Sequence, residues 1–254
     1  MFTLLFIYWN VDPTAIEIGP VTFQWYGILF ALGIVLAYQL MKKIYQKENI
    51  DSELLDYLAY FVVGGTIIGA RLGHVFFYDW EYYSQNLIEI PMIWKGGLAS
   101  HGGGIGILLA LWVYSKYFLK RPFLWIADRV TIPTCLTSIF IRIGNLMNHE
   151  IIGDPTNVPW AFVFGLVDDQ PRHPAQLYEA IAFFMIMVLL GYLYWKTKIS
   201  EKQGFITGLF FVLVFTSRFL IEFVKNSQGG MEELMNNVIS TGQLLSIPFI
   251  LSGI

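Results

Sequence analysis

Charged residues and cysteine are both scarce in this sequence. Only 14% of its 254 residues are charged, 56% are hydrophobic, and the mean hydropathy is +0.56. A soluble domain carries about 25% charged residues, so the composition excludes a large soluble core and indicates a polytopic membrane protein. The single cysteine, Cys135, cannot form an intramolecular disulfide and excludes a cysteine-cluster metal site.

The patterns typical of a metal site or a nucleic-acid surface are missing as well. The four histidines show no H-E-x-x-H spacing, and no tract of the sequence is polybasic. We therefore expect no metal and no nucleic-acid partner. The N-terminus has no basic region before Phe2–Trp9, so we interpret that segment as interfacial and not as a cleaved signal peptide.

Long apolar segments make up most of the chain, and seven of them are near the ~20 residues that a helix needs to cross a membrane. The predicted spans are 23–41, 57–78, 98–118, 124–146, 176–195, 204–224 and 238–254. Residues 147–175 are interrupted by prolines, so we expect an irregular external arm there, with a short strand around Trp160–Val167. The sequence thus predicts one all-α polytopic membrane domain over residues 1–254.

Lysine and arginine residues in the loops predict how this domain is oriented. Nine of them fall in the loops on one side of the predicted spans, and three fall on the other side. Cytoplasmic loops carry the excess of positive charge. We therefore expect the N-terminus outside and, after seven crossings, the C-terminus in the cytoplasm.

Several ionisable residues lie in the outer halves of predicted spans: Arg71, His101, Arg142, Arg218 and Glu222. Each buried charge costs about 2.5–3.5 kcal/mol on insertion scales, and a purely structural scaffold does not explain that cost. We expect seven helices around one outward-facing polar cavity. A transporter is the alternative, but the spans show no evident inverted repeat, and the polar groups do not cluster at the midplane.

Glycines and spaced polar pairs add further hypotheses. Gly65, Gly69 and Gly73 repeat at every fourth residue, which predicts close packing against a neighbouring helix. The H-G-G-G run that begins at His101 is either an anion-binding helix start or a tightly packed one. Because the chain has no G-x-S-x-G, a serine hydrolase is disfavoured. The i, i+4 spacing of Arg218 and Glu222 fits a structural ion pair as well as a site.

Six motifs in order resemble one family, bacterial prolipoprotein diacylglyceryl transferase, over nearly the whole chain. They are Q-W-Y-G at 24–27, G-A-R-L-G at 69–73, G-G-L-A-S-H-G-G-G-I-G at 96–106, R-I-G-N-L-M-N-H-E-I-I-G at 142–153, R-H-P-A-Q-L-Y-E-A at 172–180 and R-F-L-I-E-F at 218–223. Ile141, Leu146 and Ser100 depart from the family's usual glycine, phenylalanine and aromatic residue. The polar positions match.

The resemblance implies a transferase of the bacterial plasma (inner) membrane that needs no cofactor and no metal. The diacylglyceryl group of phosphatidylglycerol would pass to the lipobox cysteine thiol of a preprolipoprotein, forming a thioether and releasing glycerol phosphate. This is the first step of lipoprotein maturation. The implied partners are phosphatidylglycerol, the signal-peptide lipobox and plasma membrane lipids.

Roles for individual residues follow from the resemblance and from their chemistry. Arg142 and Arg218 would stabilise the negative charge that develops on the leaving phosphate. A thiol with a pKa near ~8.5 needs a base, and we expect His101 in that role, with Tyr26 as the alternative catalytic group. The expected substrate-binding residues are Arg71, Gly102, Gly103, Arg142, Asn145, Asn148, Glu150, Gly153, His173 and Glu222.

Overall fold

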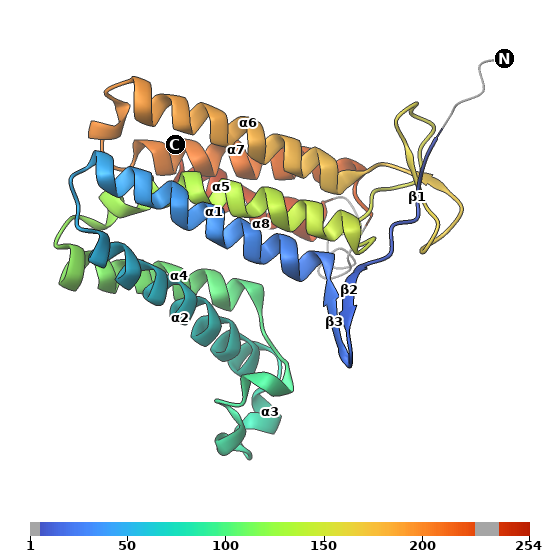
Figure 1. Cartoon of the computed structure of the whole chain (residues 1–254), viewed down its shortest axis with the longest axis horizontal. Coiled ribbons are helices and arrows are strands. Elements are labelled where there is room, and N and C mark those ends of the chain that lie inside the picture. The colour runs from blue at the N-terminus through green and yellow to red at the C-terminus, as the bar shows by residue number, and fades with distance from the viewer. Residues whose placement is uncertain (1–5, 227–238) are drawn as a thin grey trace. The chain divides into compact units, whose positions relative to one another are not determined.

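The computed structural model describes residues 6–226 and 239–254 (Figure 1). The chain divides into two compact units, a larger one of Met1–Leu40 with Val130–Ile254 and a smaller one of Met41–Arg129. Two predictions reach outside the described residues, the interfacial segment at residues 2–5 and the start of the seventh span at residue 238.

Six helices among the described residues are long and apolar enough to cross a membrane. They are α1 (Trp25–Lys47), α2 (Ser52–Phe77), α4 (Ser100–Tyr114) continued by η3 (Ser115–Leu119), α5 (Phe123–Met147), α6 (Ala175–Lys196), and α7 (Phe205–Ile221) continued by η5 (Glu222–Val224). They match the first six predicted spans, which confirms a mostly helical, multi-pass membrane protein. Within the seventh predicted span, α8 (Thr241–Ser252) has 12 residues, fewer than the ~20 that a full crossing needs.

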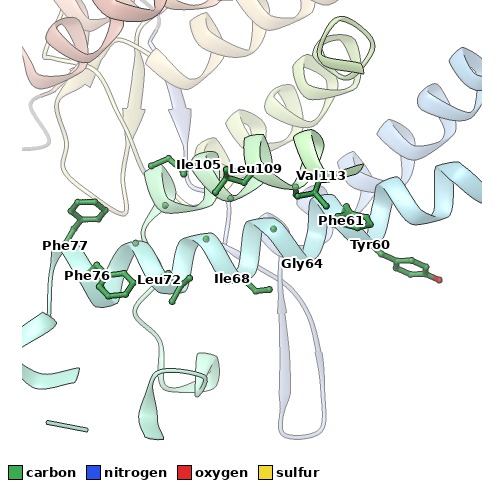
Figure 2. A pocket seen from close by; sticks show the side chains of 16 residues that line it. Tyr60, Phe61, Gly64, Ile68, Leu72, Phe76, Phe77, Ile105, Leu109 and Val113 are labelled. Carbon is green, nitrogen blue, oxygen red and sulfur yellow. The ribbon is translucent and has the colours of Figure 1, made fainter. Parts of the chain in front are cut away.

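In the smaller unit, α2 and α4 pack closely along glycines, as the sequence predicts. A β-carbon on Gly65 would lie 2.7 Å from the Gly106 carbonyl oxygen, and one on Gly73 would lie 2.7 Å from the Gly102 α-carbon. Real β-carbons do not approach other atoms so closely, so only glycine permits this contact. An apolar groove of about 650 Å³ follows the helix pair on one side (Figure 2). The unit also contains α3 (Trp80–Tyr83), η1 (Leu87–Glu89) and η2 (Ile93–Lys95).

In the larger unit, a small sheet lies at the end of the helices where α5 ends and α6 begins (Figure 1). Its strand order is β1-β4-β5, with β1 (Ile7–Trp9) parallel to β4 (Phe162–Phe164) and β5 (Pro171–Arg172) antiparallel to β4. β4 confirms the strand predicted around Trp160–Val167. A separate hairpin of β2 (Thr14–Ile18) and β3 (Val21–Gln24) leads directly into α1, and η4 (Ile199–Glu201) follows α6.

A small apolar core fixes this sheet to the end of α5. Leu146, Ile152, Phe162 and Phe164 are buried together, with Trp9 packed against them. The Trp9 indole donates a hydrogen bond to the Leu146 carbonyl oxygen at 3.0 Å, which satisfies one of the carbonyls that a helix end leaves free. The chain that follows α5 is therefore held in a defined position, and it carries four predicted site residues, Asn148, Glu150, Gly153 and His173.

Candidate functional site

The turn that follows α5 has a constrained backbone. His149 (φ 55°) and Ile151 (φ 57°) both have left-handed conformations, which are uncommon for residues other than glycine. The His149 ring is hydrogen-bonded to the Val11 carbonyl oxygen at 2.8 Å. Gln176, at the start of α6, donates to the Glu150 carbonyl oxygen at 2.5 Å. These contacts fix the turn with the Glu150 side chain directed back toward α5.

The polar side chains of this turn form one continuous network. Arg142 Nη1 donates to Asn145 Oδ1 at 3.3 Å, and Asn145 Nδ2 donates to Glu150 Oε2 at 3.2 Å. Asn148 Nδ2 donates to the other carboxylate oxygen of Glu150 at 3.2 Å. Arg142 and Asn145 share one face of α5 because they are three residues apart. Four residues predicted from one stretch of sequence are thus linked in one chain of hydrogen bonds.

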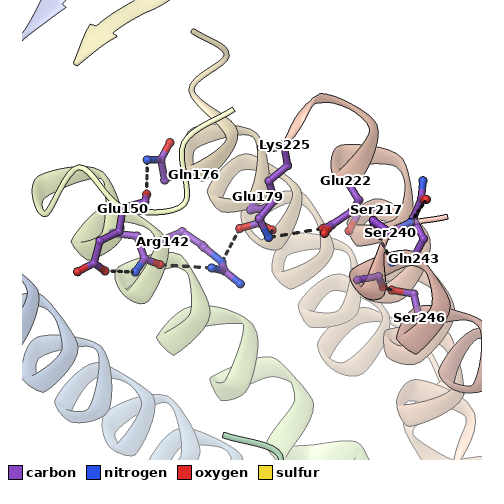
Figure 3. Close-up of polar contacts among 12 residues, drawn as sticks. Arg142, Glu150, Gln176, Glu179, Ser217, Glu222, Lys225, Ser240, Gln243 and Ser246 are labelled. Carbon is purple, nitrogen blue, oxygen red and sulfur yellow. Dashed lines mark hydrogen bonds and ion pairs between the residues drawn. The ribbon is translucent and has the colours of Figure 1, made fainter. Parts of the chain in front are cut away.

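A second chain of charges leads away from Arg142 on its other side (Figure 3). Arg142 Nε lies 2.7 Å from Glu179 Oε2, Lys225 Nζ lies 3.7 Å from Glu179 Oε1, and Lys225 Nζ lies 3.5 Å from Glu222 Oε2. The side chains of Glu179, Lys225 and Glu222 are only 4%, 5% and 9% exposed. Charges buried this deeply are costly unless they are paired, so each of these groups depends on its neighbours.

Arg142 and Arg218 line the same cavity. It has a volume of about 250 Å³, and Glu179 and Ser217 contribute to its wall. Arg218 is half-buried, and among the described residues it makes no hydrogen bond or ion pair. The ion pair considered between Arg218 and Glu222 is absent there, because Glu222 pairs with Lys225. Two guanidinium groups and one carboxylate leave this cavity with a net positive charge, which suits an anion.

Tyr26 packs against α5 one turn or less from Arg142. A β-carbon on Gly144 would lie 2.8 Å from Tyr26 Cδ2, so a larger residue at position 144 would displace the tyrosine ring. The ring also stacks on Phe30, with the centroids 6.4 Å apart and the planes 20° apart. Gly144 therefore has a packing role close to Arg142.

Gly153 and His173 meet through the backbone of the arm at residues 147–175. The Gly153 N–H donates to the His173 carbonyl oxygen at 2.9 Å, and His173 Nδ1 is hydrogen-bonded to the Tyr178 hydroxyl at 3.0 Å. Arg172 donates to the Gly153 carbonyl oxygen and pairs with Asp168 at 2.5 Å. The Arg172 guanidinium holds the pKa of the Asp168 carboxyl below its usual range. This pair stabilises the arm next to the turn.

The remaining predicted site residues belong to the smaller unit. His101 lies in the first turn of α4, where its exposed ring is hydrogen-bonded to the Tyr78 hydroxyl at 3.1 Å. Gly102 and Gly103 are buried, and Gly102 lies against the backbone of Gly73 in α2. The glycine-rich start of α4 is therefore closely packed, which was one of the two interpretations of the H-G-G-G run.

Arg71 is 2% exposed and directs its guanidinium at backbone carbonyl oxygens. It donates to Ile90 at 2.7 Å, to Gly96 at 2.6 Å, to Gly97 at 3.3 Å and to Glu89 at 2.8 Å. A planar fork with several fixed donors suits this arrangement. In this structure Arg71 organises the loop that precedes α4. Its predicted role in substrate binding stays a prediction.

Comparison with known proteins decides the family. Residues 13–254 match the family model described as prolipoprotein diacylglyceryl transferase. The chain belongs to this family. A relative from Tolumonas auensis is 52% identical over 248 residues, covering 98% of this chain and 95% of the relative. Relatives from Chloroherpeton thalassium (44% identical; 100% and 94% covered) and Porphyromonas gingivalis (45%; 98% and 93%) are similar over equally long stretches. All three are named phosphatidylglycerol–prolipoprotein diacylglyceryl transferase.

In this member of the transferase family, sequence reasoning assigned no role to Glu179, Lys225 or Gln176. The signal that could have found two of them is local: Gln176 and Glu179 are three residues apart at the start of an otherwise apolar helix. Two polar side chains on one face of such a helix indicate an interior partner. Among the described residues, no group of three or more His, Cys, Asp and Glu side chains could hold a metal ion.

Proposed function

We propose that this protein transfers the diacylglyceryl group of phosphatidylglycerol to the lipobox cysteine thiol of a preprolipoprotein. The observation that carries the proposal is a cavity lined by two guanidinium groups in a member of the prolipoprotein diacylglyceryl transferase family. The names of the relatives give the same donor and acceptor. Six helices that are long and apolar enough to cross a membrane support access to a lipid donor.

In the proposed reaction, the thiolate sulfur attacks the glyceryl carbon that bears the phosphate ester. A C–S bond forms, the C–O bond breaks, and the electron pair stays on the phosphate oxygen. The products are a thioether and glycerol phosphate. Because the leaving phosphate monoester gains negative charge as the C–O bond breaks, fixed cations at its oxygens favour the transition state over the ground state.

Arg142 and Arg218 are the proposed cations. Glu179 fixes Arg142 through Nε at 2.7 Å, which supports a preorganised guanidinium at the cavity that Arg218 also lines. Preorganised charges are effective because they need no rearrangement during the reaction. Asn145, Asn148 and Glu150, already linked to Arg142, offer amide and carboxylate groups for the hydroxyls of the glycerol headgroup.

His101 is the proposed base that removes the thiol proton, with Tyr26 as the alternative. The hydrogen bond between His101 Nε2 and the Tyr78 hydroxyl supports an oriented ring. An oriented base within reach of the thiol raises the thiolate fraction at neutral pH. Arg71, Gly102, Gly103, Gly153, His173 and Glu222 are proposed to shape or bind the substrate region.

We also propose the finer membrane arrangement that the loops predict. The chain would cross the bacterial inner membrane seven times around an outward-facing polar cavity, with its N-terminus outside and its C-terminus in the cytoplasm. The excess of lysine and arginine in the loops on one side supports this orientation.

The test is reconstitution of the full chain in vesicles with a lipobox peptide. With phosphatidylglycerol in the vesicles, mass analysis should show the peptide heavier by one diacylglyceryl group on its cysteine. Vesicles of phosphatidylethanolamine should give no product, since that headgroup lacks the net negative charge that the arginines select. An unmodified peptide with both lipids would contradict the proposed function.

A further inference from the structure

Glu222 lies one helical turn beyond Arg218, yet the two do not pair. A spacing of four residues places oppositely charged side chains next to each other on a helix. The Glu222 carboxylate instead lies 3.5 Å from Lys225 Nζ. No hydrogen bond or ion pair of Arg218 is present in the part of the chain that the structure describes, and its guanidinium lines the cavity with Arg142.

Lys225 forms the ion pair with Glu222. Its side chain is 5% exposed, and it lies between two carboxylates, those of Glu222 at 3.5 Å and Glu179 at 3.7 Å (Figure 3). If this ammonium group were removed, Glu222 would be left as a buried, uncompensated charge, which is strongly unfavourable. The cation nearest to it along the same helix is Arg218.

The Glu222 carboxylate also lies against Gly242. A β-carbon at position 242 would lie 2.7 Å from Glu222 Oε2, so glycine is required for the carboxylate to rest there. Gly242 is in the first turn of α8, whose start is fixed by a capping box between Ser240 and Gln243. A helix N-terminus favours a nearby negative charge. Glu222 is thus held by Lys225 and by the start of α8.

We infer that Lys225 is a positioning residue that keeps Glu222 away from Arg218 and so leaves the Arg218 guanidinium available to the donor phosphate. The inference rests on the proposed function, because it assigns Lys225 a purpose in binding that phosphate. Glu179 then positions two cations, because its carboxylate pairs with both Arg142 and Lys225.

The experiment compares four full-length proteins in phosphatidylglycerol nanodiscs: wild type, Lys225→Met, Lys225→Met with Glu222→Gln, and Lys202→Met as the control at an exposed lysine. Transfer to a lipobox peptide gives kcat/KM. Lys225→Met should lower it about 10- to 100-fold, the effect of one lost charge-assisted contact. The double variant should recover about tenfold over Lys225→Met, because the neutral amide at position 222 no longer captures Arg218. Lys202→Met should match wild type.

A double variant as slow as Lys225→Met would overturn the inference, because removal of the Glu222 charge should leave the Arg218 guanidinium available again. If Lys225→Met does not reach the membrane, Gly242→Ala tests the same idea with every charge retained. Its added methyl would lie 2.7 Å from Glu222 Oε2 and so displaces the flexible carboxylate from this position. The inference expects the displaced carboxylate to pair with Arg218, and a wild-type rate in this variant would refute the mechanism.

A second measurement separates this inference from the proposed function. Native mass spectrometry of the same proteins compares bound phosphatidylglycerol with phosphatidylcholine. Lys225→Met should lose the preference for the anionic lipid, and the double variant should regain it. If wild type shows this preference but forms no thioether, the proposed reaction fails and the role of Lys225 stands. If all variants bind both lipids alike, the role of Lys225 fails.

Discussion

Arg142→Lys keeps the positive charge of Arg142 but removes its planar fork, and we expect this variant to insert normally and transfer slowly. Arg142 contacts Glu179 through Nε at 2.7 Å and Asn145 through Nη1 at 3.3 Å, so one guanidinium binds several partners at once. A lysine ammonium is a single point of charge. If it stays with Glu179, the donor phosphate loses one charge-assisted contact of about 1.5–3 kcal/mol, roughly a 10- to 100-fold loss in rate.

Arg142→Gln should be worse in both rate and stability. It leaves the Glu179 carboxylate, 4% exposed, with Lys225 at 3.7 Å as its remaining ion-pair partner among the described residues, and breaking a buried ion pair costs about 3–5 kcal/mol. The assay is transfer at saturating phosphatidylglycerol, with membrane abundance and thermal unfolding measured in parallel. Arg121→Lys, at an exposed position, is the matched control. A lysine variant with the wild-type rate would show that charge alone suffices and would refute the role given to the planar fork of Arg142.

Four further predictions address other parts of the molecule. His101→Gln should lose about 10²–10⁴-fold in transfer rate, and the defect should shrink at high pH, where the thiol ionises unaided; a pH-independent defect would contradict its role as base. Gly106→Leu should lower the free energy of unfolding by about 1–3 kcal/mol through overpacking, because its β-carbon would lie 2.9 Å from the Gly69 α-carbon. The control Gly104→Leu places its side chain in open space and should have little effect. Equal melting temperatures for the two variants would argue against the glycine contact. Asp168 has a lowered pKa in the folded arm, so its pairing with Arg172 should stabilise the protein above the ordinary aspartate pKa near ~3.9, and this stabilisation should be lost as the pH falls below that value. Asp168→Asn should therefore unfold at a lower temperature than wild type at neutral pH but not in acid. An equal difference in melting temperature at both pH values would contradict the pairing. A reporter fused at Lys198 should be cytoplasmic and one at Asn157 external, and finding both on one side would exclude the predicted topology.

Hydropathy identified the membrane helices because burial in lipid demands apolar side chains, but it could not place their ends. α2 begins at Ser52, five residues before the predicted span, since Asp51 caps the helix by accepting from the Glu53 N–H at 3.0 Å. α1 continues to Lys47, beyond the predicted end at 41. In both cases the helix extends through polar residues that a search for apolar segments does not detect.

The site was predictable where its contacts are local and was missed where they are not. Arg142, Asn145, Asn148 and Glu150 lie within nine residues, so their proximity could be inferred from helix and turn geometry. The contact between Glu179 and Lys225 joins α6 to the end of η5, and no periodicity in either segment indicates which helices are neighbours. The pairing of β1 with β4 depends in the same way on tertiary packing.

The most direct test of the account is to quantify both products of a single reaction. Wild-type protein in phosphatidylglycerol vesicles with a lipobox peptide should yield diacylglyceryl thioether and free glycerol phosphate in equal amounts, and Arg218→Gln should reduce both together. Release of glycerol without phosphate, or acylation of the peptide in place of a thioether, would contradict displacement of a phosphate group held by Arg142 and Arg218.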